Sequence, residues 1–340
     1  MKLGLGLYPS ILTDDNLKFA RQLSVTHIVA WMPLPVGNGV WEFADLLRLK
    51  KYINSFGLEL DALENFQPAH WDKILLDRPG KEAQMENLKA TIRNLGKVGI
   101  PIMGYYFSLA GVWGHWRSGS NNSAGRGGAG LTSFDYDLVK DAPLIPKGEA
   151  WCGWKVEADP EPGTIGEVAH AEMWERLRYF LESLVPVAEE AGVRLAAHPD
   201  DPPVPVLRGT ARLLTCHENY RRLIEMKPSP SNALEFCQGT VAEMGQDTYE
   251  AIRYFGSRKK IAYVHFRNVR GDFPNRFDEV FIDEGDVDMV LAMRAYLEVG
   301  YDGVLIPDHS PHVTCQSPWH AGMAYALGYM RACMQFLGVK

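Results

Sequence analysis

Four residues of types that commonly bind metal ions, His198, Cys237, His265 and Asp308, each follow a short apolar run of the chain. Each run has the length and composition of a buried strand. Imidazole, thiolate and carboxylate groups all bind divalent metals, and three or four protein ligands leave positions open for water or substrate. Taken singly, a strand-end His is more often hydrogen-bonded structure, and a lone Cys a small buried hydrophobe. The shared position of all four instead predicts one metal centre and an enzyme.

The segments that would position these ligands alternate between strand-like and helix-like patterns. The expected strands are residues 3–7, 27–31, 58–64, 101–107, 193–198, 233–237, 261–266 and 303–307. Helical patterns lie between them, at residues 43–56, 82–98, 168–191 and 286–299, and glycines follow them at Gly57, Gly99, Gly192 and Gly300. Glycine tolerates the left-handed conformation that often ends a helix.

Eight strands with intervening helices predict an α/β fold, a (β/α)8 barrel, with residues 1–340 forming one domain. The C-terminal strand ends of such a barrel meet at one mouth, so ligands far apart in sequence would meet there. A doubly wound open sheet is the alternative. It usually has fewer strands, and the glycine fingerprint of dinucleotide binding is missing after the first expected strand.

Residues 108–165 break the alternation and are too long for an ordinary connection after the fourth strand. This insertion is rich in Gly, Ser, Asn and Trp. Because it would leave the barrel at the mouth, we expect a lid; a disordered surface insertion is the alternative. Within it, Trp113 and His115 are candidate substrate-binding residues, since aromatic rings pack against sugars. They could equally anchor the insertion to the barrel.

Further candidates adjoin the expected ligands. Arg267 and Asn268 follow His265 and could bind a substrate carboxylate or hydroxyl, because the Arg fork donates two parallel hydrogen bonds. An outward-facing salt bridge is the alternative for Arg267. His309 adjoins Asp308, and its imidazole titrates near neutral pH, which suits a catalytic proton-transfer role.

Composition limits the class of protein. The chain has 340 residues, 46% hydrophobic and 23% charged, so a sizeable core is expected. A net charge of −7 gives no electrostatic reason to bind nucleic acid. No stretch approaches the roughly 18 apolar residues that span a membrane. Five unpatterned cysteines indicate a reducing compartment, so we expect a cytoplasmic protein. We expect its partner to be a small molecule, a sugar or a sugar acid.

Several motifs resemble the mannonate dehydratases of hexuronate breakdown, a family in the xylose-isomerase-like barrel group. The resemblance covers most of the chain, and its most specific parts are residues 198–203 (HPDDPP), 233–240 (ALEFCQGT), 264–269 (VHFRNV) and 300–309 (GYDGVLIPDH). It implies a (β/α)8 fold and an Mn²⁺ ion held by His198, Cys237, His265 and Asp308. Fe²⁺, Co²⁺, Ni²⁺ and Zn²⁺ are the alternatives.

The resemblance also implies that D-mannonate is dehydrated to 2-keto-3-deoxy-D-gluconate and that His309 is the catalytic acid/base. The sequence departs from the family pattern at Ile306, at Ser310 and at Met323, which occupies the position of a family tyrosine. A thioether cannot transfer a proton. His312, Tyr325 or a residue of the 108–165 insertion would then supply the second proton function.

If none of these groups does, the substrate has changed. The alternative function is therefore a metal-dependent eliminase, isomerase or epimerase that acts on another sugar or on a keto-glycoside. A catalytically inactive sugar or metal binder is a third possibility, which the intact ligand set disfavours. We also expect a homo-oligomer.

Overall fold

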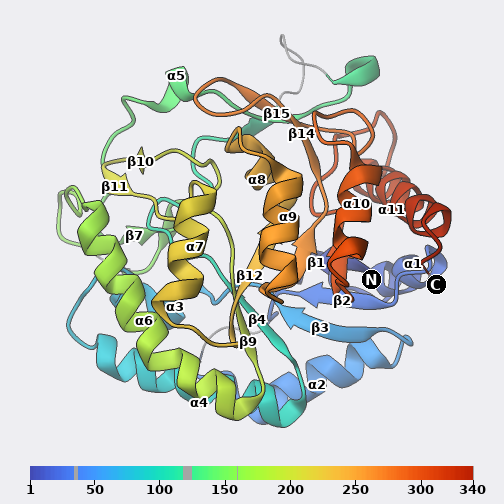
Figure 1. The fold of residues 1–340 in the computed structure, drawn as a ribbon. Coiled ribbons are helices and arrows are strands. Elements are labelled where there is room, and N and C mark those ends of the chain that lie inside the picture. The colour runs from blue at the N-terminus through green and yellow to red at the C-terminus, as the bar shows by residue number, and fades with distance from the viewer. Residues whose placement is uncertain (34–36, 118–124, 159, 340) are drawn as a thin grey trace.

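Eight parallel strands close into a barrel in the computed structural model, which describes residues 1–33, 37–117, 125–158 and 160–339 (Figure 1). In chain order the barrel strands are β1 (Lys2–Leu7), β2 (His27–Ala30), β3 (Glu59–Leu63), β4 (Ile102–Tyr105), β9 (Arg194–Ala197), β12 (Asn232–Cys237), β13 (Ile261–His265) and β16 (Val304–Ile306). Each overlaps one of the eight expected strands, so the predicted (β/α)8 barrel is confirmed. β1 closes the barrel by pairing with both β16 and β2.

Helices surround the barrel and include the four expected from the glycine-terminated patterns. They are α1 (Asp14–Gln22), α2 (Phe43–Asn54), α3 (Pro68–Leu75), α4 (Lys81–Val98), α5 (Tyr136–Val139), α6 (His170–Ala191), α7 (His217–Met226), α8 (Gln238–Glu243), α9 (Thr248–Ser257), α10 (Met289–Glu298) and α11 (Pro318–Phe336), with short 3-10 turns η1 (Pro9–Ile11) and η2 (Arg126–Gly128).

The ends of these helices follow from local chemistry. α4 and α6 stop at Gly99 and Gly192, whose φ angles of 77° and 67° are left-handed. α10 begins later than the expected residue 286. The carboxylate of Asp288 accepts hydrogen bonds from the N–H groups of Val290 and Leu291, and it therefore caps a helix that starts at Met289.

The insertion after β4 contributes to a second, smaller sheet. Its strands β5 (Trp116–Arg117) and β6 (Thr132–Phe134) join β14 (Asn268–Arg270) and β15 (Phe277–Val280), which follow β13, in the order β14-β15-β6-β5. β14, β15 and α5 lie together at the top of Figure 1. Short hairpins β7 (Glu149–Ala150) with β8 (Trp154–Lys155), and β10 (Val206–Leu207) with β11 (Thr210–Ala211), complete the strands. The part of the insertion at 118–124 and 159 lies outside the described residues.

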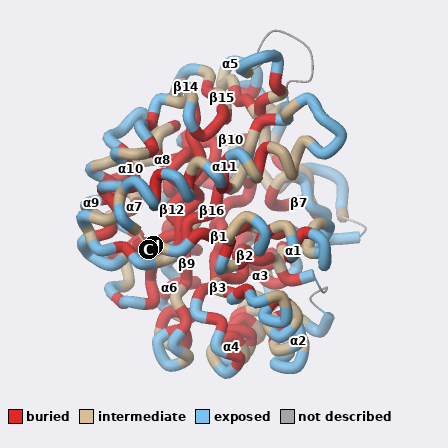
Figure 2. Tube along the Cα trace, turned by 90° about the vertical axis from the view of Figure 1, so that its right-hand side faces the viewer, coloured by how far each residue is buried: buried red, intermediate tan, exposed pale blue. Residues whose placement is uncertain are grey.

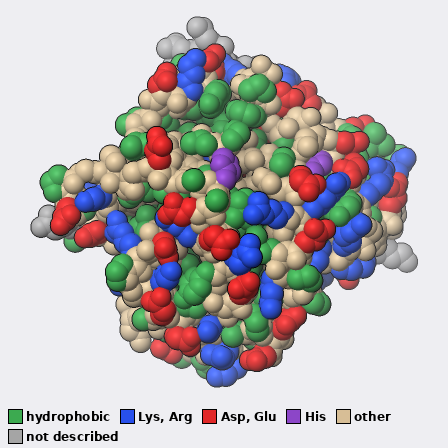
Figure 3. Space-filling view, turned by 60° about the vertical axis from the view of Figure 1, so that its left-hand side comes forward, with side chains coloured by type: hydrophobic (Ala, Val, Ile, Leu, Met, Phe, Trp, Pro, Cys, Tyr) green, Lys and Arg blue, Asp and Glu red, His purple; other side chains and the backbone are tan. Residues whose placement is uncertain are grey.

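Buried residues fill the barrel and its contact with the helices, as the red segments of Figure 2 show. Trp71, Tyr105 and Phe180 belong to this core and pack against one another with tilted or edge-on rings. On the face drawn in Figure 3, Lys and Arg side chains are interspersed with Asp and Glu. Among the described residues, none of the helices has both the length and the apolar composition required to cross a bilayer.

One buried histidine makes stability depend on pH. His70 in α3 is 1% exposed, packs edge-on against Trp41, and has no hydrogen-bond partner at either ring nitrogen. Burial lowers its pKa to about 4. His70 therefore binds a proton more readily in the unfolded chain than in the folded protein. Its effect on the unfolding free energy is absent above about pH 6.5, and this free energy falls as the pH drops toward 4.

We expect this histidine to cost wild-type protein about 2 kcal/mol of unfolding free energy between pH 7.5 and pH 5, since each pH unit below 6.5 contributes about 1.4 kcal/mol. His70→Phe should remove that loss, and His170→Phe, at an exposed position, should retain it. Urea unfolding of the wild type and the two variants at pH 7.5 and pH 5 measures these differences in unfolding free energy. Equal pH dependence in wild type and His70→Phe would contradict the assignment.

Candidate metal centre and active site

Three of the four predicted metal ligands converge at the mouth of the barrel. His198 directly follows β9, while Cys237 and His265 are the last residues of β12 and β13 and stand side by side in register. The donor atoms of these three side chains all lie within 4.8 Å of one another. Cys237 is fully buried and His265 is 2% exposed. The strands thus bring together two imidazoles and one thiol, as the sequence predicts.

Asp308 takes a different place. Its carboxylate Oδ2 lies 3.3 Å from Nδ1 of His265 and 3.2 Å from Nε of Arg267. Among the described residues it is not part of the mutually close group of donors. Its φ of 58° is left-handed, a conformation that Asp tolerates better than most residues. Asp308 therefore lies beside His265 at the edge of the centre, and its role as the fourth ligand stays a prediction.

The electrostatics of the site favour a thiolate. Burial alone would raise the pKa of Cys237, but the charge of Arg267 and the close imidazoles of His198 and His265 outweigh it and lower the pKa to about 5. The hydroxyl of Thr240 also donates to Sγ at 3.1 Å. A thiolate is the form that binds a metal. Burial would lower the pKa of His198, yet Glu235 and Cys237 raise it to about 9.

The donors fit a divalent cation. His198 directs Nδ1 at the carbonyl of Pro199, at 2.7 Å, which leaves Nε2 for a metal. Neither nitrogen of His265 nor either oxygen of Glu235 makes a hydrogen bond, although all four atoms are buried. Buried polar atoms normally have partners, and buried anions are usually paired or bound to metals. A cation at this point would give one nitrogen of His265 and the nearby carboxylate of Glu235 a partner.

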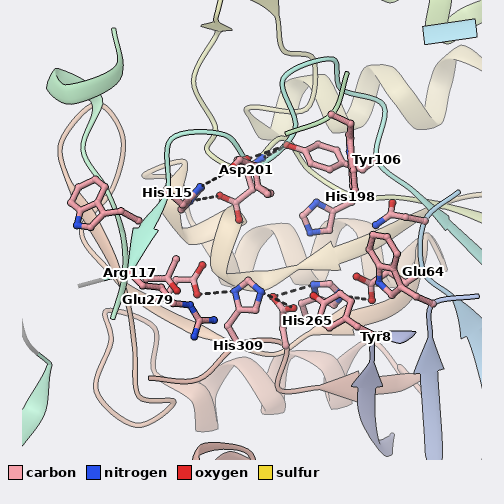
Figure 4. A pocket seen from close by; sticks show the side chains of 17 residues that line it. Tyr8, Glu64, Tyr106, His115, Arg117, His198, Asp201, His265, Glu279 and His309 are labelled. Carbon is pink, nitrogen blue, oxygen red and sulfur yellow. Dashed lines mark hydrogen bonds and ion pairs between the residues drawn. The ribbon is translucent and has the colours of Figure 1, made fainter. Parts of the chain in front are cut away.

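A second feature is an imidazole backed by a carboxylate. His309 directs Nδ1 at Oε2 of Glu279, at 2.7 Å, while its Nε2 lies 3.7 Å from Asp308. Figure 4 shows His309 between Glu279 and His265. Burial lowers the pKa of His309, but the charges of Asp308 and Glu279 outweigh it and raise the pKa to about 9. The arrangement fixes the ring and leaves Nε2 for proton transfer.

The structure does not place Arg267 or Asn268 among the residues that line the cavity next to the predicted metal ligands. Arg267 is 3% exposed and donates to Glu243 and Asp201, each at 2.7 Å. The amide of Asn268 donates to two backbone carbonyls in the segment that leads to α10. Their donors are thus taken up by the protein, so we interpret both as residues that hold the site together, in place of the predicted contact with substrate.

Arg267→Met should lower the unfolding free energy by about 3–5 kcal/mol, because it leaves the buried carboxylates of Asp201 and Glu243 without their counter-charge. Arg253→Met, which removes an exposed ion pair with Glu298, should cost less than about 1 kcal/mol. Denaturant unfolding of the two variants measures the contrast. Equal losses would show that the buried network contributes no more than a surface pair.

A cavity of about 380 Å³ lies above the donors, within the range of small-molecule sites. The insertion supplies part of its wall, including the predicted His115, whose Nε2 faces Asp201 at 3.1 Å. Trp113 lies outside the wall and stacks on Arg208. The lining residues are Tyr8, Trp31, Glu64, Asn65, Tyr106, Val112, His115, Trp116, Arg117, Thr132, Trp151, His198, Asp201, His265, Glu279, Asp308 and His309 (Figure 4).

Most candidates for the second proton-transfer group lie outside the cavity. Met323 is buried in the core on α11, and Tyr325 contacts Arg126 and Phe281; none of these lines the cavity. His312 contacts Arg117 at the cavity's edge but is not part of the lining.

Tyr8, which follows β1, lies beside His265 in the cavity (Figure 4). Tyr8 is 40% exposed as a whole, but desolvation of its hydroxyl and the charges of Glu64 and Asp308 hold its pKa well above the usual range, so the hydroxyl keeps its proton.

A closed barrel with imidazole, thiol and carboxylate groups at its strand ends, beside a cavity of small-molecule size, is typical of an enzyme that binds a small polar substrate at a metal centre. The model of the D-mannonate dehydratase (UxuA) family matches residues 12–340. The chain belongs to this family, and it is therefore an enzyme of the hydro-lyase class.

Individual proteins of known name that resemble this chain support the same family. The chain is 33% identical over 280 residues to mannonate dehydratase 2 of Halalkalibacterium halodurans, which covers 80% of this chain and 79% of the relative. It is 32% identical over 327 residues to the Thermotoga maritima mannonate dehydratase, covering 91% and 89%. The solved mannonate dehydratase of Streptococcus suis serotype 2 superposes with a TM-score of 0.81 at 26% identity, covering 99% and 95%. An L-ribulose 3-epimerase, at 17% identity and a TM-score of 0.61, shares the barrel fold.

Proposed function

We propose that this enzyme dehydrates D-mannonate to 2-keto-3-deoxy-D-gluconate at a divalent metal held by His198, Cys237, His265 and Asp308. The relatives' names support the substrate. The observation that carries the proposal is the carboxylate-backed His309, which shares one cavity with two of the three mutually close donors. A sugar acid must contact His309 and the metal at the same time to lose a proton and a hydroxyl from neighbouring carbons.

The reaction is an elimination without net oxidation. The C2–H bond breaks, its electron pair forms the C2=C3 bond, and the C3 hydroxyl leaves as water after it is protonated. The resulting enol rearranges to the 2-keto acid. A divalent metal would stabilise the negative charge that develops on the carboxylate side of the substrate and would favour the neutral form of the adjoining His309 ring.

Two side chains would transfer the protons. His309 accepts the C2 proton at Nε2, because Glu279 holds its Nδ1. The hydroxyl of Tyr8 donates to the departing C3 oxygen, because it remains protonated and lines the same cavity. In this assignment Tyr8 supplies the function that Met323 cannot.

Tyr8→Phe should lower kcat by about 10²-fold, near the lower limit for loss of a general acid, because the leaving hydroxyl loses its proton donor. Metal content should be unchanged. Tyr325→Phe, whose ring lies outside the cavity lining, is the matched control and should retain full activity. Steady-state kinetics distinguishes the two variants; equal activities would remove Tyr8 from the reaction.

We propose Mn²⁺ as the resident metal and the cytoplasm as the compartment. All five cysteines are free thiols, and a thiol such as Cys237 must stay reduced to bind a metal. Softness of the His and Cys donors would also accommodate Zn²⁺ or Fe²⁺. The expectation of a homo-oligomer stays a prediction.

A panel of aldonates, each tested with Mn²⁺, Fe²⁺, Co²⁺, Ni²⁺ and Zn²⁺, tests the proposed function. D-mannonate should give a 2-keto-3-deoxy acid faster than its C2 epimer D-gluconate, because the C2 proton must face His309. No turnover of any aldonate with any of these metals would end the proposal. Turnover of keto-glycosides alone would favour the eliminase alternative.

A further inference from the structure

A continuous row of aromatic rings lines one side of the cavity. It consists of Tyr8, Trp31, Trp151 and Tyr106. The ring centroids of Tyr8 and Trp31 lie 5.5 Å apart. By the same measure, Trp151 lies 5.7 Å from Trp31 and 6.0 Å from Tyr106. Figure 4 shows Tyr8 and Tyr106 on the opposite side of the cavity from Glu279. We call these four rings the aromatic row.

The aromatic row presents mainly hydrocarbon to the cavity, because most of its polar atoms are buried or paired. The indole nitrogens of Trp31 and Trp151 are buried. The hydroxyl of Tyr106 donates to the carbonyl of Asp201 at 3.1 Å and accepts from Arg212 at 2.7 Å. These three residues therefore offer a ligand their ring surfaces, as the apolar walls of small-molecule sites do.

The backbone holds Trp151 in this place in an unfavourable conformation. Trp151 and Cys152 lie at the turn between β7 and β8, with φ angles of 50° and 66°. Such left-handed angles are unusual for a bulky residue. The N–H groups of both residues donate to the carbonyls of Leu109 and Ala110, which hold the turn. Strain of this kind gathers at active sites and ligand clamps, so the placement of this indole ring indicates a role in binding.

The order of the rings follows the order of the carbons in the proposed function, on which this inference rests. In that reaction His309 takes the proton from C2, and Tyr8 serves the hydroxyl of C3. Trp31 is next to Tyr8, and Trp151 is next to Trp31. A substrate that places C2 and C3 at the two proton-transfer groups therefore extends O4 and the groups beyond it along the aromatic row.

An open-chain aldonate makes poor use of such a surface. D-mannonate carries a hydroxyl on each carbon from C2 to C6, so neither side of its chain is apolar. A pyranose ring has one face made largely of C–H groups, and these pack against the electron-rich faces of aromatic rings. Cavities of about 380 Å³ also commonly hold ligands that are larger than a six-carbon acid.

The aromatic surface continues out of the cavity at Trp154. The ring centroid of Trp154 lies 6.1 Å from that of Trp151. Trp154 is 49% exposed and does not line the cavity. A ligand that rests on Trp31 and Trp151 can therefore extend toward solvent past this residue.

We propose that the aromatic row binds a pyranosyl group, and that the preferred substrate is an aldonate that carries such a group at O4. The C2–H and C3–O bonds break as they do in free D-mannonate, and the glycosidic bond at O4 stays intact. The products are the 4-O-glycosyl 2-keto-3-deoxy acid and water. Free D-mannonate is then the slower of the two substrates.

Kinetics with 4-O-β-D-mannopyranosyl-D-mannonate, prepared by oxidising the reducing end of mannobiose, tests this proposal. Its kcat/KM should exceed that of D-mannonate by about 10-fold, near what one further aromatic contact contributes. Turnover of both acids with equal kcat/KM, or with a lower value for the disaccharide acid, would overturn the proposal.

Two variants locate the effect in the aromatic row. Trp151→Leu and Trp31→Leu should each reduce the preference for the disaccharide acid to less than about 3-fold. Trp113→Leu should keep the full preference and is the matched control, because Trp113 belongs to the same insertion but lies outside the cavity lining. The preference is a ratio, so a loss of folded protein does not change it. An unchanged preference in both Trp151→Leu and Trp31→Leu would contradict the proposal.

Binding separates this proposal from the proposed reaction. Calorimetric titration of Mn²⁺-loaded His309→Asn protein, in which turnover should be blocked, should show about 10-fold tighter binding of the disaccharide acid than of D-mannonate. If the wild type dehydrates neither acid but this difference in affinity is present, the proposed reaction fails and the pyranosyl site stands. Equal affinities, or no binding of either acid, would overturn the pyranosyl site.

Discussion

Replacing His309 by Asn should lower kcat by about 10²–10⁴-fold, the range over which a positioned acid or base contributes to catalysis. The amide cannot accept the C2 proton, although it can still hydrogen-bond Glu279. The metal donors are separate side chains, so bound metal should stay at the wild-type level. Steady-state kinetics together with metal analysis of the purified variant measures both properties.

Glu279→Gln is the companion variant, because Glu279 touches His309 and is not itself in the proposed proton path. Removing its charge should lower the pKa of His309, so the acidic limb of the pH–rate profile should move to lower pH. Wild-type turnover by His309→Asn would exclude His309 as the proton-transfer residue. An unmoved profile in Glu279→Gln would exclude Glu279 as the residue that sets its basicity.

Cys237→Ala should abolish turnover through loss of the metal. The variant loses a ligand outright, so its metal affinity should fall by more than the roughly 10–100-fold that is typical when a supporting residue is removed. Added Mn²⁺ at high concentration should restore at most a small part of the activity. Metal content after dialysis and a Mn²⁺ titration provide the measurement.

Cys333→Ala is the matched control, because Cys333 is also buried but lies on α11. It should keep both metal and activity. Stoichiometric metal in dialysed Cys237→Ala would contradict the role of the thiolate. Exhaustive chelation of the wild-type enzyme should abolish its activity, as Cys237→Ala does. Added Mn²⁺ should restore the activity of the chelated wild-type enzyme.

The barrel could be predicted from sequence because its strands are short, mainly apolar runs. Strands buried on both faces keep this composition along their whole length, and the helices between them end at glycines that adopt left-handed angles. The strand ends then determine which residues meet. His198, Cys237 and His265 were predicted to converge for this reason, and their donor atoms do converge.

Other parts of the site depend on side-chain direction and tertiary pairing, which a strand pattern does not contain. Arg267 and Asn268 follow His265 closely, yet both turn into the protein. Glu279 could not be predicted, because β15 is positioned by its pairing with β14 and with β6 of the insertion, which no strand pattern indicates. Trp113 lies in a segment without periodicity, where no pattern indicates which ring faces the cavity.

Glu235 had a signal that the sequence interpretation passed over. It is a charged residue inside an otherwise apolar strand, two positions before a predicted ligand. Buried acids are rare unless they are paired or bound to a cation, so its position already indicated a nearby partner such as His265. Tyr8 had a weaker signal, as a polar aromatic residue at the C-terminal end of the first strand.

The most direct test of the metal-dependent dehydration is a proton NMR experiment in D₂O with Mn²⁺-reconstituted enzyme and D-mannonate. The mechanism predicts 2-keto-3-deoxy-D-gluconate that carries one solvent deuterium at C3, because the enol collects its proton from water. The same sample treated with a chelator should show unchanged D-mannonate. Unchanged D-mannonate in the Mn²⁺ sample, or a product that retains the C3 hydroxyl, would contradict the proposed function.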